Sequence, residues 1–425
     1  MREMRDSGVE WIGDIPSTWE IRKVKSLLNM QTGFTPDTKN EDYYSDEGVD
    51  WVTIGDLSGG KYIPSETKKR ISNEYVEAFA PEIVPAGSLL YSFKLSVGQT
   101  AFTDRPVYTN EAIASFIETD SYSLEFLRFA AFLIEYNANT NIYGAHLLNQ
   151  ELIKNALLVV PPIEEQRYLA AFLDERCNRV DALIANVQAQ IEKLKAYKQS
   201  LITEVVTKGL DPSVPMKDSG VEWLGEIPEH WEVTRIKNLF DLRNERNDEA
   251  DLSKVNLISL YTDLGVVQHS DIVETTGNRA VTAEGYKFVH KNDIVVNIIL
   301  CWMGAVGMSN YDGVTSPAYD IYRPKEGTLS EYYHYLFRTK RFNGECYRYG
   351  RGIMMMRWRT YSTEFRAIDI PCPPHDEQVA IIEHLKAKSY QIDQLIAIKQ
   401  KKIDKLNDYK KSLIYEYVTG KKEVR

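Results

Sequence analysis

The chain lacks any apolar run long enough to cross a membrane, and its first residues, MREMRDSGVE, lack the apolar core of a signal peptide. Its 425 residues include only four cysteines, which are far apart and show no C-x-x-C spacing: Cys177, Cys301, Cys346 and Cys372. A disulfide framework and a structural zinc site are therefore not expected. A reducing cytoplasm is the predicted location, with no membrane partner.

Complete catalytic motifs are also missing. The segment GDLSGGK ends at Lys61, but Tyr62 stands where a phosphate loop needs a Ser or Thr for magnesium. Residues 316–319, SPAY, differ by one residue from the tetrapeptide of amino-methyltransferases, and no glycine-rich cofactor motif accompanies them. The seven histidines show no metal-ligand spacing. We expect a chain with no catalytic residues, no metal site and no cofactor of its own.

The sequence does contain one frame written twice. MRDSGVEWIGDIPSTWEIRKVKSLL at 4–28 returns as MKDSGVEWLGEIPEHWEVTRIKNLF at 216–240, with 14 of 25 positions identical. PPIEEQ at 161–166 returns as PPHDEQ at 373–378, and AYKQSLITEVVT at 196–207 returns as DYKKSLIYEYVT at 408–419. All three matches are displaced by the same number of residues, which carries Met4 onto Met216 and is called the repeat offset below. A constant offset indicates two copies of one module. Because the sequence between the matches has diverged, we predict a pseudo-symmetric protein whose two copies recognise two different targets.

Charge is distributed unevenly between the two divergent inserts. The net charge of −10 argues weakly against nucleic-acid binding. Within the second insert, however, residues 338–366 carry eight Lys and Arg against two Glu, interleaved with Tyr347, Tyr349, Trp358 and Tyr361. Basic and aromatic side chains mixed in this way suit contact with phosphates and base edges. The alternative reading of this stretch is an ordinary solvated surface.

Two long helices are the clearest structural prediction. No Pro or Gly occurs between Pro162 and Gly209, or between Pro374 and Gly420. Apolar residues in both stretches recur at spacings of three and four, which is a heptad seam that Cys177, Lys198, Lys399 and Lys410 interrupt. A run of ~45 residues forms a rod of roughly 65–70 Å. We expect the two helices to pair in antiparallel order, with Val180, Ile184, Ile191 and Leu194 facing Ile392, Ile396, Ile403 and Leu406.

Taken together, these features resemble the specificity subunit of type I restriction-modification systems. The resemblance depends on the twin GVEW openings, on the turns Pro161-Pro162 with Glu165-Gln166 and Pro373-Pro374 with Glu377-Gln378, and on the long helix after each turn. It covers nearly the whole chain. It implies an α+β fold in which two globular α/β target recognition domains are joined by two long antiparallel coiled-coil helices.

The resemblance also implies domains and partners. Each recognition domain reads one half of a bipartite, asymmetric site in double-stranded DNA, and the helices set the spacer. Two modification subunits supply S-adenosylmethionine-dependent adenine methylation, and a restriction subunit, whose presence stays open, uses ATP and Mg. The expected domains are 1–160 (recognition domain 1), 161–210 (first spacer helix), 211–372 (recognition domain 2) and 373–425 (second spacer helix).

The resemblance further implies that DNA-reading loops lie in the inserts, including the loop before the last strand of each. Asn and Gln can bond adenine at two atoms, and Arg can do the same with guanine. The residues we expect to contact bases are Tyr143, His146, Asn149 and Gln150 in the first domain and Arg348, Arg351, Arg357 and Arg359 in the second. The residues we expect to contact phosphates are Lys68, Lys69, Arg70 and Lys94.

Two other classes of function compete with this reading. A stand-alone methyltransferase or nuclease needs the motifs that are incomplete here; Pro36-Asp37 with Glu66-Thr67-Lys68, for example, matches a nuclease pattern only loosely. A coiled-coil scaffold that binds no DNA has no need for two unlike inserts in one frame. The divergence of the inserts therefore favours the DNA-specificity reading.

Overall fold

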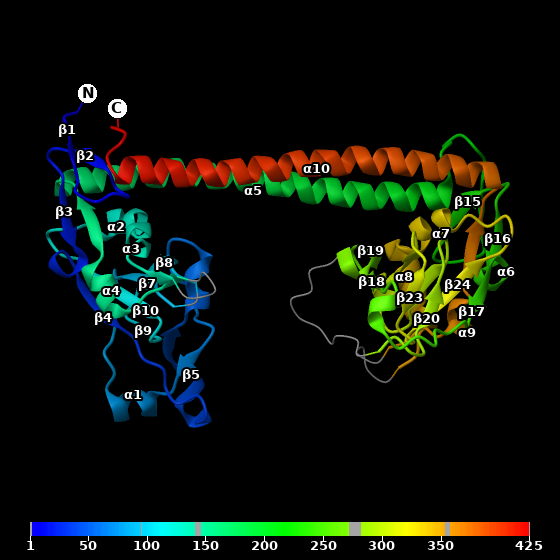
Figure 1. Ribbon diagram of the computed structural model, residues 1–425, viewed down its shortest axis with the longest axis horizontal. Coiled ribbons are helices and arrows are strands. Elements are labelled where there is room, and N and C mark those ends of the chain that lie inside the picture. Colours follow the sequence, from blue (N-terminus) through cyan, green and yellow to red (C-terminus); the bar gives the residue numbers. More distant parts are fainter. Residues whose placement is uncertain (1, 95, 141–145, 272–281, 353–357, 425) are drawn as a thin grey trace. The chain divides into compact units, whose positions relative to one another are not determined.

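The computed structural model describes residues 2–94, 96–140, 146–271, 282–352 and 358–424. The chain forms two compact units, Met1–Val187 with Lys402–Arg425 and Gln188–Lys401. Each unit contains one divergent insert and a part of both long helices, α5 (Ile163–Lys208) and α10 (His375–Val418). Figure 1 labels the elements along the chain.

The first unit is built on an antiparallel four-stranded sheet of order β4-β10-β7-β8. A second sheet, β6-β5-β9, pairs β5 and β9 in parallel. The strands of this unit are β1 (Met4–Asp6), β2 (Asp14–Pro16), β3 (Glu20–Lys23), β4 (Asn29–Thr32), β5 (Tyr44–Val52), β6 (Arg70–Ile71), β7 (Leu89–Ser92), β8 (Thr100–Phe102), β9 (Tyr108–Thr109), β10 (Ile113–Ile117), β11 (Asn139–Thr140), β12 (His146–Leu147) and β13 (Leu157–Val160). Its short helices are α1 (Asn73–Phe79), α2 (Leu124–Ala130), α3 (Phe132–Glu135) and α4 (Gln150–Asn155).

The second unit repeats this plan with a different sequence. Its four-stranded antiparallel sheet has the order β17-β24-β21-β22. The strands are β14 (Met216–Asp218), β15 (Glu226–Pro228), β16 (Glu232–Arg235), β17 (Phe240–Arg243), β18 (Ile258–Tyr261), β19 (Gly265–Gln268), β20 (Lys287–Val289), β21 (Ile294–Asn297), β22 (Val306–Met308), β23 (Gly313–Thr315), β24 (Tyr319–Pro324) and β25 (Asp369–Cys372). The helices are α6 (Ile236–Leu239), α7 (Ser330–Phe337), α8 (Lys340–Tyr349) and α9 (Ser362–Phe365).

Each unit buries its sheet against the ends of the long helices. In the first unit Tyr91 and Phe116 share a core with Leu173 from α5 and Leu413 from α10. In the second unit Val296 and Tyr322 do the same with Val206 from α5 and Leu385 from α10. The globular part of each unit is therefore packed directly onto the helix pair.

The repeated sequence motifs meet in space at the start of each long helix. The buried Trp19 donates its indole N–H to Glu165 Oε2 at 3.0 Å, and Trp231 donates to Glu377 Oε2 at 2.8 Å. Beside them, Gln166 and Gln378 donate to the carbonyls of Pro161 and Pro373. A buried indole N–H needs an acceptor, so each Trp in the opening motif depends on the Glu of the Pro-Pro turn.

The hairpins that open each half also have matching roles. The β1–β2 hairpin lies against the end of α10, where the Tyr415 hydroxyl donates to the carbonyl of Trp11 at 3.1 Å. Gly420 has φ +70°, and a Cβ there would come within 2.4 Å of Pro16, so only glycine fits this close approach. In the second unit the end of α5 at Gly209 lies against Trp231. Each long helix thus ends on the opening motif of one module copy.

The long helices pair in antiparallel order inside each unit (Figure 1). In the first unit Lys410 of α10 donates to Asp181 of α5, and in the second Lys198 of α5 donates to Asp393 of α10. Of the residues predicted to face one another, Val180, Ile191, Ile392 and Ile403 are buried and Ile184, Leu194, Ile396 and Leu406 are half-buried. Their individual partners across the seam stay a prediction.

Candidate nucleic-acid interface

Both inserts present a β-hairpin at the same place, just before the short helix and the last strand. In the first unit Asn139 pairs with Leu147, across the hairpin of β11 and β12. In the second unit Arg351 pairs with Arg359, and each backbone N–H donates to the other residue's carbonyl, at 2.8 and 2.9 Å. The repeat offset carries Asn139 onto Arg351 and Leu147 onto Arg359, so the hairpins are repeat-related. One frame therefore presents two hairpins of different chemistry.

Packing by aromatic side chains supports the second hairpin. Trp358 stacks on Tyr347 of α8 with ring centroids 4.9 Å apart, and its indole N–H donates to the carbonyl of Tyr347. Trp302 meets the same tyrosine edge-on at 5.7 Å. A Cβ on Gly350 would come within 2.3 Å of the Trp358 ring, so this glycine permits the close approach. Trp358 and Tyr347 thus position the base of the basic hairpin.

The arginines predicted to read bases differ in their surroundings. Arg348 forms an ion pair with Glu345 at 2.6 Å, and hydrogen bonding to this carboxylate raises the pKa of the guanidinium. Arg351 forms an ion pair with Glu364 at 2.8 Å. Arg359 is half-buried and makes no ion pair with the part of the chain that the structure describes. Arg357 lies outside the described residues. Among the three of these arginines that the structure describes, Arg359 is therefore the one whose guanidinium is not held by a carboxylate.

The first hairpin presents amide side chains beside its base. Asn149 is exposed, and its side-chain oxygen accepts from the backbone N–H of Leu152, so it forms the N-cap of α4. Gln150 is exposed and donates to the Thr32 hydroxyl at 2.7 Å. His146 lies in β12 by its backbone, and Tyr143 lies outside the described residues. The cap uses the oxygen of Asn149 and leaves its amide nitrogen for contact with a base.

The four cations predicted to contact phosphates fall into two groups. Lys68 and Lys69 are exposed and, with Arg70 and Tyr44, line a pocket of about 440 Å³. Arg70 is partly neutralised because it forms an ion pair with Asp50 at 3.3 Å. Lys94 is exposed in the loop after β7, with its ammonium 5.9 Å from the Phe93 ring. Lys68 donates to the carbonyl of Gly55 at 3.4 Å, and none of the three lysines forms an ion pair with the described part of the chain, unlike Arg70.

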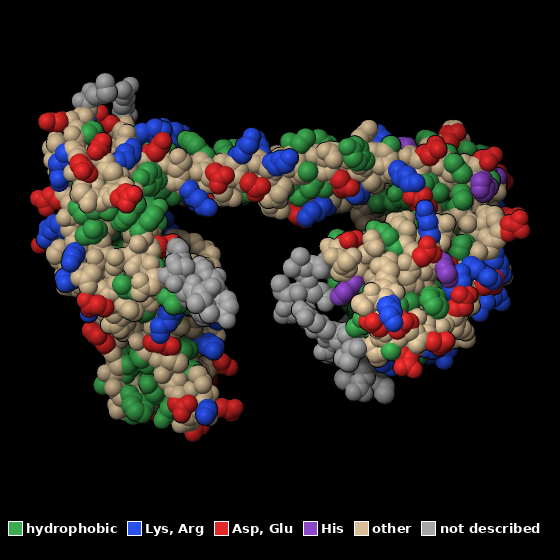
Figure 2. Space-filling model, viewed as in Figure 1, with side chains coloured by type: hydrophobic (Ala, Val, Ile, Leu, Met, Phe, Trp, Pro, Cys, Tyr) green, Lys and Arg blue, Asp and Glu red, His purple; other side chains and the backbone are tan. Residues whose placement is uncertain are grey.

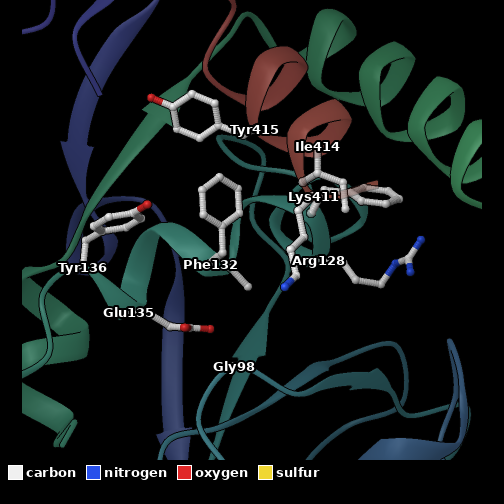
Figure 3. Close-up of a pocket in the computed structure, with 10 residues that line it drawn as sticks. Gly98, Arg128, Phe132, Glu135, Tyr136, Lys411, Ile414 and Tyr415 are labelled. Atoms are coloured by element: carbon white, nitrogen blue, oxygen red, sulfur yellow. The ribbon is translucent and has the colours of Figure 1, made fainter. Parts of the chain in front are cut away.

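A larger cavity lies at the helix pair of the first unit. It has a volume of about 610 Å³, and Figure 3 shows Phe132, Tyr136 and Tyr415 around it with Arg128, Glu135 and Lys411. Arg128 forms an ion pair with Asp174 of α5, and Lys411 is exposed on α10. The lining is therefore largely apolar, with charged side chains of both signs among it.

Two observations bear on the remaining classes of site. Among the described residues, no three His, Cys, Asp or Glu side chains gather in a group that could hold a metal ion. No helix in the described part of the chain is long and apolar enough to span a membrane.

Comparison with known proteins decides the family. The model of the type I restriction modification DNA specificity domain matches twice, at residues 16–193 and 228–408. The chain belongs to this family. It carries two target recognition domains and is a specificity subunit, which in these systems is not the catalytic subunit, so the resemblance seen in the sequence is confirmed.

Specificity subunits from other organisms match this chain, one of them over nearly its full length. The putative type I restriction enzyme MjaX specificity subunit of Methanocaldococcus jannaschii is 23% identical, over 97% of this chain and 96% of its own length. The MjaIX specificity subunit of the same organism is 27% identical, over 56% of this chain and 55% of its own length. The EcoBI specificity subunit of Escherichia coli is 24% identical over 70% of this chain and 67% of its own length.

Solved structures support the predicted fold. One match is a chain from a structural study of the assembly and conformational transition of the type I R-M system. It has a TM-score of 0.68 and 14% identity, and the match covers 95% of this chain and 98% of that one. The HsdS subunit of Thermoanaerobacter tengcongensis has a TM-score of 0.50 and 15% identity, covering 96% and 98%. The specificity subunit is thus α+β, with two domains joined by packed helices.

Sequence reasoning missed two groups of residues in the specificity subunit. The pairs Trp19–Glu165 and Trp231–Glu377 could have been found, since both partners belong to the repeated motifs. The seam lysines Lys198 and Lys410 were noted only as interruptions, whereas each one forms an ion pair across the helices. Nothing in the spacing of one helix shows which residue lies opposite.

Proposed function

We propose that the first recognition domain (1–160) and the second (211–372) each read one half of a bipartite, asymmetric DNA site. The segments 161–210 and 373–425, which contain α5 and α10, set the gap between the halves. The repeat-related hairpins support this most directly, because one frame presents Asn139 and Leu147 in one copy and Arg351 and Arg359 in the other. Two identical readers would read a symmetric site; two unlike readers read an asymmetric one.

The chemistry of the hairpins predicts different bases. Arg359 and Arg351 suit guanine O6 and N7 in the major groove, whereas the Asn149 amide nitrogen suits adenine N7 and Gln150 suits adenine N6 and N7. Phosphate contacts from Lys68, Lys69 and Lys94 position the first domain without reading sequence. Because the whole chain carries a net charge of −10, partner subunits supply much of the remaining phosphate contact.

The helices also carry two matching exposed surfaces, which we assign to two copies of one modification subunit. Each unit exposes a leucine from one helix and a tyrosine from the other that have equivalents in the other unit. The repeat offset relates the two leucines and the two tyrosines: Leu183 (52% exposed) and Tyr409 (55%) in the first unit, Leu395 (47%) and Tyr197 (56%) in the second. Figure 2 shows hydrophobic side chains interspersed with charged ones along the helices. Exposed apolar groups at equivalent places favour binding of two equivalent partners.

In this proposal the partners carry the chemistry. The modification subunits bind S-adenosylmethionine and methylate adenine, and a restriction subunit, where present, uses ATP and Mg; all act in the cytoplasm. The cavity of Figure 3 adds an aromatic surface beside the helix pair in the first unit. An Ala at Tyr197 or Tyr409 is expected to reduce the number of bound modification subunits from two to one, measured by native mass spectrometry. Lys405→Ala, also exposed on α10, is the matched control.

The decisive experiment maps methylated adenines by long-read sequencing of DNA from cells that express the chain with its modification subunit. The expected product is one bipartite motif. Arg359→Ala is the preferred variant for testing base recognition. Arg351→Ala would also remove the ion-pair partner of the largely buried Glu364. We expect Arg359→Ala to cost roughly 1–3 kcal/mol at one base pair and to relax that half only. Lys254→Gln, on the same unit, should change nothing, and methylation of an unbroken motif would refute the proposal.

A further inference from the structure

The apolar seam between α5 and α10 is interrupted by the same ion pair twice. Lys198 Nζ donates to both carboxylate oxygens of Asp393, at 2.8 and 2.7 Å. Lys410 Nζ donates to both oxygens of Asp181, each at 2.7 Å. The repeat offset carries Lys198 onto Lys410 and Asp181 onto Asp393. The two pairs are therefore one device, present in both copies of the module.

Stability does not explain why these residues stand in an apolar seam. All four side chains are partly exposed, and the lysines are the better covered members of each pair. Ion pairs with this much solvent contact add little free energy, and an apolar residue at a seam position would pack better. A polar residue placed in a coiled-coil seam has a better attested use, which is to specify one register at some cost in stability.

Sliding one helix along the other by one heptad shows what these charges would prevent. A slip of one heptad in one direction places Lys198 opposite Gln400 and Asp393 opposite Val205. A slip in the other direction places Lys198 opposite Lys386 and Asp393 opposite Ile191. Either slip loses the Lys198–Asp393 ion pair; for the repeat-related pair, one slip leaves Lys410 opposite Gln188 and the other opposite Asp174. Either slip also places the Asp393 carboxylate against an apolar residue, and one of the slips adds repulsion between two lysines.

The position of each pair fits this use. Asp181 lies one turn beyond Cys177 on α5, and Lys410 lies one turn before Leu413 on α10; both of these neighbours belong to the first unit's core. In the second unit Lys198 lies one turn before Leu201, which packs against that unit's core. Each pair therefore lies next to the point where the helices pass out of a hydrophobic core. It holds the alignment of the two helices in the stretch beyond that core.

We propose that Lys198–Asp393 and Lys410–Asp181 fix a single antiparallel register of α5 and α10, and thereby a single gap between the two half-sites. These four residues are positioning residues: they contact no base, and they act through the separation of the domains that do. The proposal rests on the function proposed above, because it assigns the precision of the gap to named side chains.

The test replaces both lysines together, Lys198→Asp with Lys410→Asp, in the full chain with its modification subunit. The readout is the length of the gap in every methylated motif. We expect the share of methylation at sites with a gap altered by one to three base pairs to rise about tenfold, because opposed carboxylates no longer favour the native register. The exchanged variant, with Asp181→Lys and Asp393→Lys added, should restore the single gap.

Controls distinguish failure of the register proposal from failure of the proposed DNA-recognition function. Lys193→Asp, exposed on the same helix, should leave the gap unchanged. A single unaltered gap in the double-lysine variant, or failure of the exchanged variant to restore it, would overturn the register proposal. If the reversed charges prevent assembly, Lys198→Met with Lys410→Met keeps the seam packed and gives the same readout. A wild-type complex that marks no bipartite motif would instead overturn the proposed function.

Discussion

At the scale of single residues, the buried tryptophans of the repeated openings depend on glutamates from the repeated turns. Trp19 is almost fully buried, and its indole N–H donates to Glu165. Replacing Glu165 with Ala leaves that N–H without its acceptor, which costs ~1–3 kcal/mol. We expect this loss in the free energy of unfolding of the first unit, measured by urea denaturation. Glu164→Ala, an exposed neighbour, should change it by no more than a few tenths; equal losses in both variants would contradict the pairing.

His334 makes stability depend on pH. Burial, with the nearby Arg338, lowers the pKa of its imidazole from 6.5 to about 4, and its Nδ1 accepts from the backbone N–H of Met308 at 3.1 Å. Between these two values the unfolded chain binds a proton that the folded chain does not. The stability that the neutral imidazole contributes is therefore fully present above pH 6.5. It is lost as the pH falls towards 4, by roughly 1.4 kcal/mol per pH unit at most.

The His334→Gln variant isolates this contribution, because its side-chain oxygen can still accept from Met308 while the side chain no longer titrates. We expect the free energies of unfolding of wild type and variant to differ by a constant amount above pH 6.5, and the wild type to lose stability relative to the variant as the pH falls from 6.5 towards 4. Parallel curves over that range would show that His334 is not the titrating group.

Residue chemistry alone predicted some roles and missed others. Asn149 was expected to read bases, which stays a prediction, and the structure shows that its oxygen caps α4. Lys198 and Lys410 looked like defects in a seam, because their acidic partners lie 195 and 229 residues away. A sequence shows the identity and spacing of side chains, whereas a partner distant in the chain is found only once the fold brings it close.

At the scale of elements, the two long helices could be predicted almost to their ends. Pro162 and Gly209 bracket α5, and Pro374 and Gly420 bracket α10, because proline suits the first turn and glycine the residue after the last. Shorter elements were less predictable. The segment 330–349, for example, is divided between α7 and α8, with Thr339 forming the N-cap of the second helix. Local cap chemistry competes with a continuous helical pattern in such places.

The seam between the helices should be necessary for recognition and unnecessary for the recognition domains. Ile191 is buried and Ile184 half-buried. Ile184→Asp with Ile191→Asp places unpaired charge in the seam, at a cost of several kcal/mol. We expect near-UV circular dichroism of the domains to persist, because each has its own core, while methylation of the bipartite site is lost. Ala189→Asp, exposed on the same helix, is the matched control, and full methylation by the seam variant would show that the helix pair does not couple the readers.

At the scale of the whole molecule, the repeated frame predicted two modules, and the structure shows how far their likeness extends. The two inserts have diverged, yet β4-β10-β7-β8 and β17-β24-β21-β22 share one strand order. That likeness could not be seen in the sequence, because many apolar residues can fill the same sheet positions while the fold is kept. The repeat-related hairpins show such divergence at equivalent places, since Asn139 and Leu147 of the first correspond to Arg351 and Arg359 of the second.

This organisation predicts that the readers can be exchanged one at a time. The first insert, 29–160, begins with β4 and ends with β13, and both strands are paired inside the first unit. Replacing it with the insert of a relative should therefore leave the second unit's core untouched. In the methylated motif, mapped by long-read sequencing, we expect one half to change while the other half and the gap stay the same. The reciprocal exchange of 241–372 should change only the opposite half, since its hairpin belongs to the second unit. A change in both halves after either exchange would mean that the two domains read DNA jointly, and the independence of the units would then have to be abandoned.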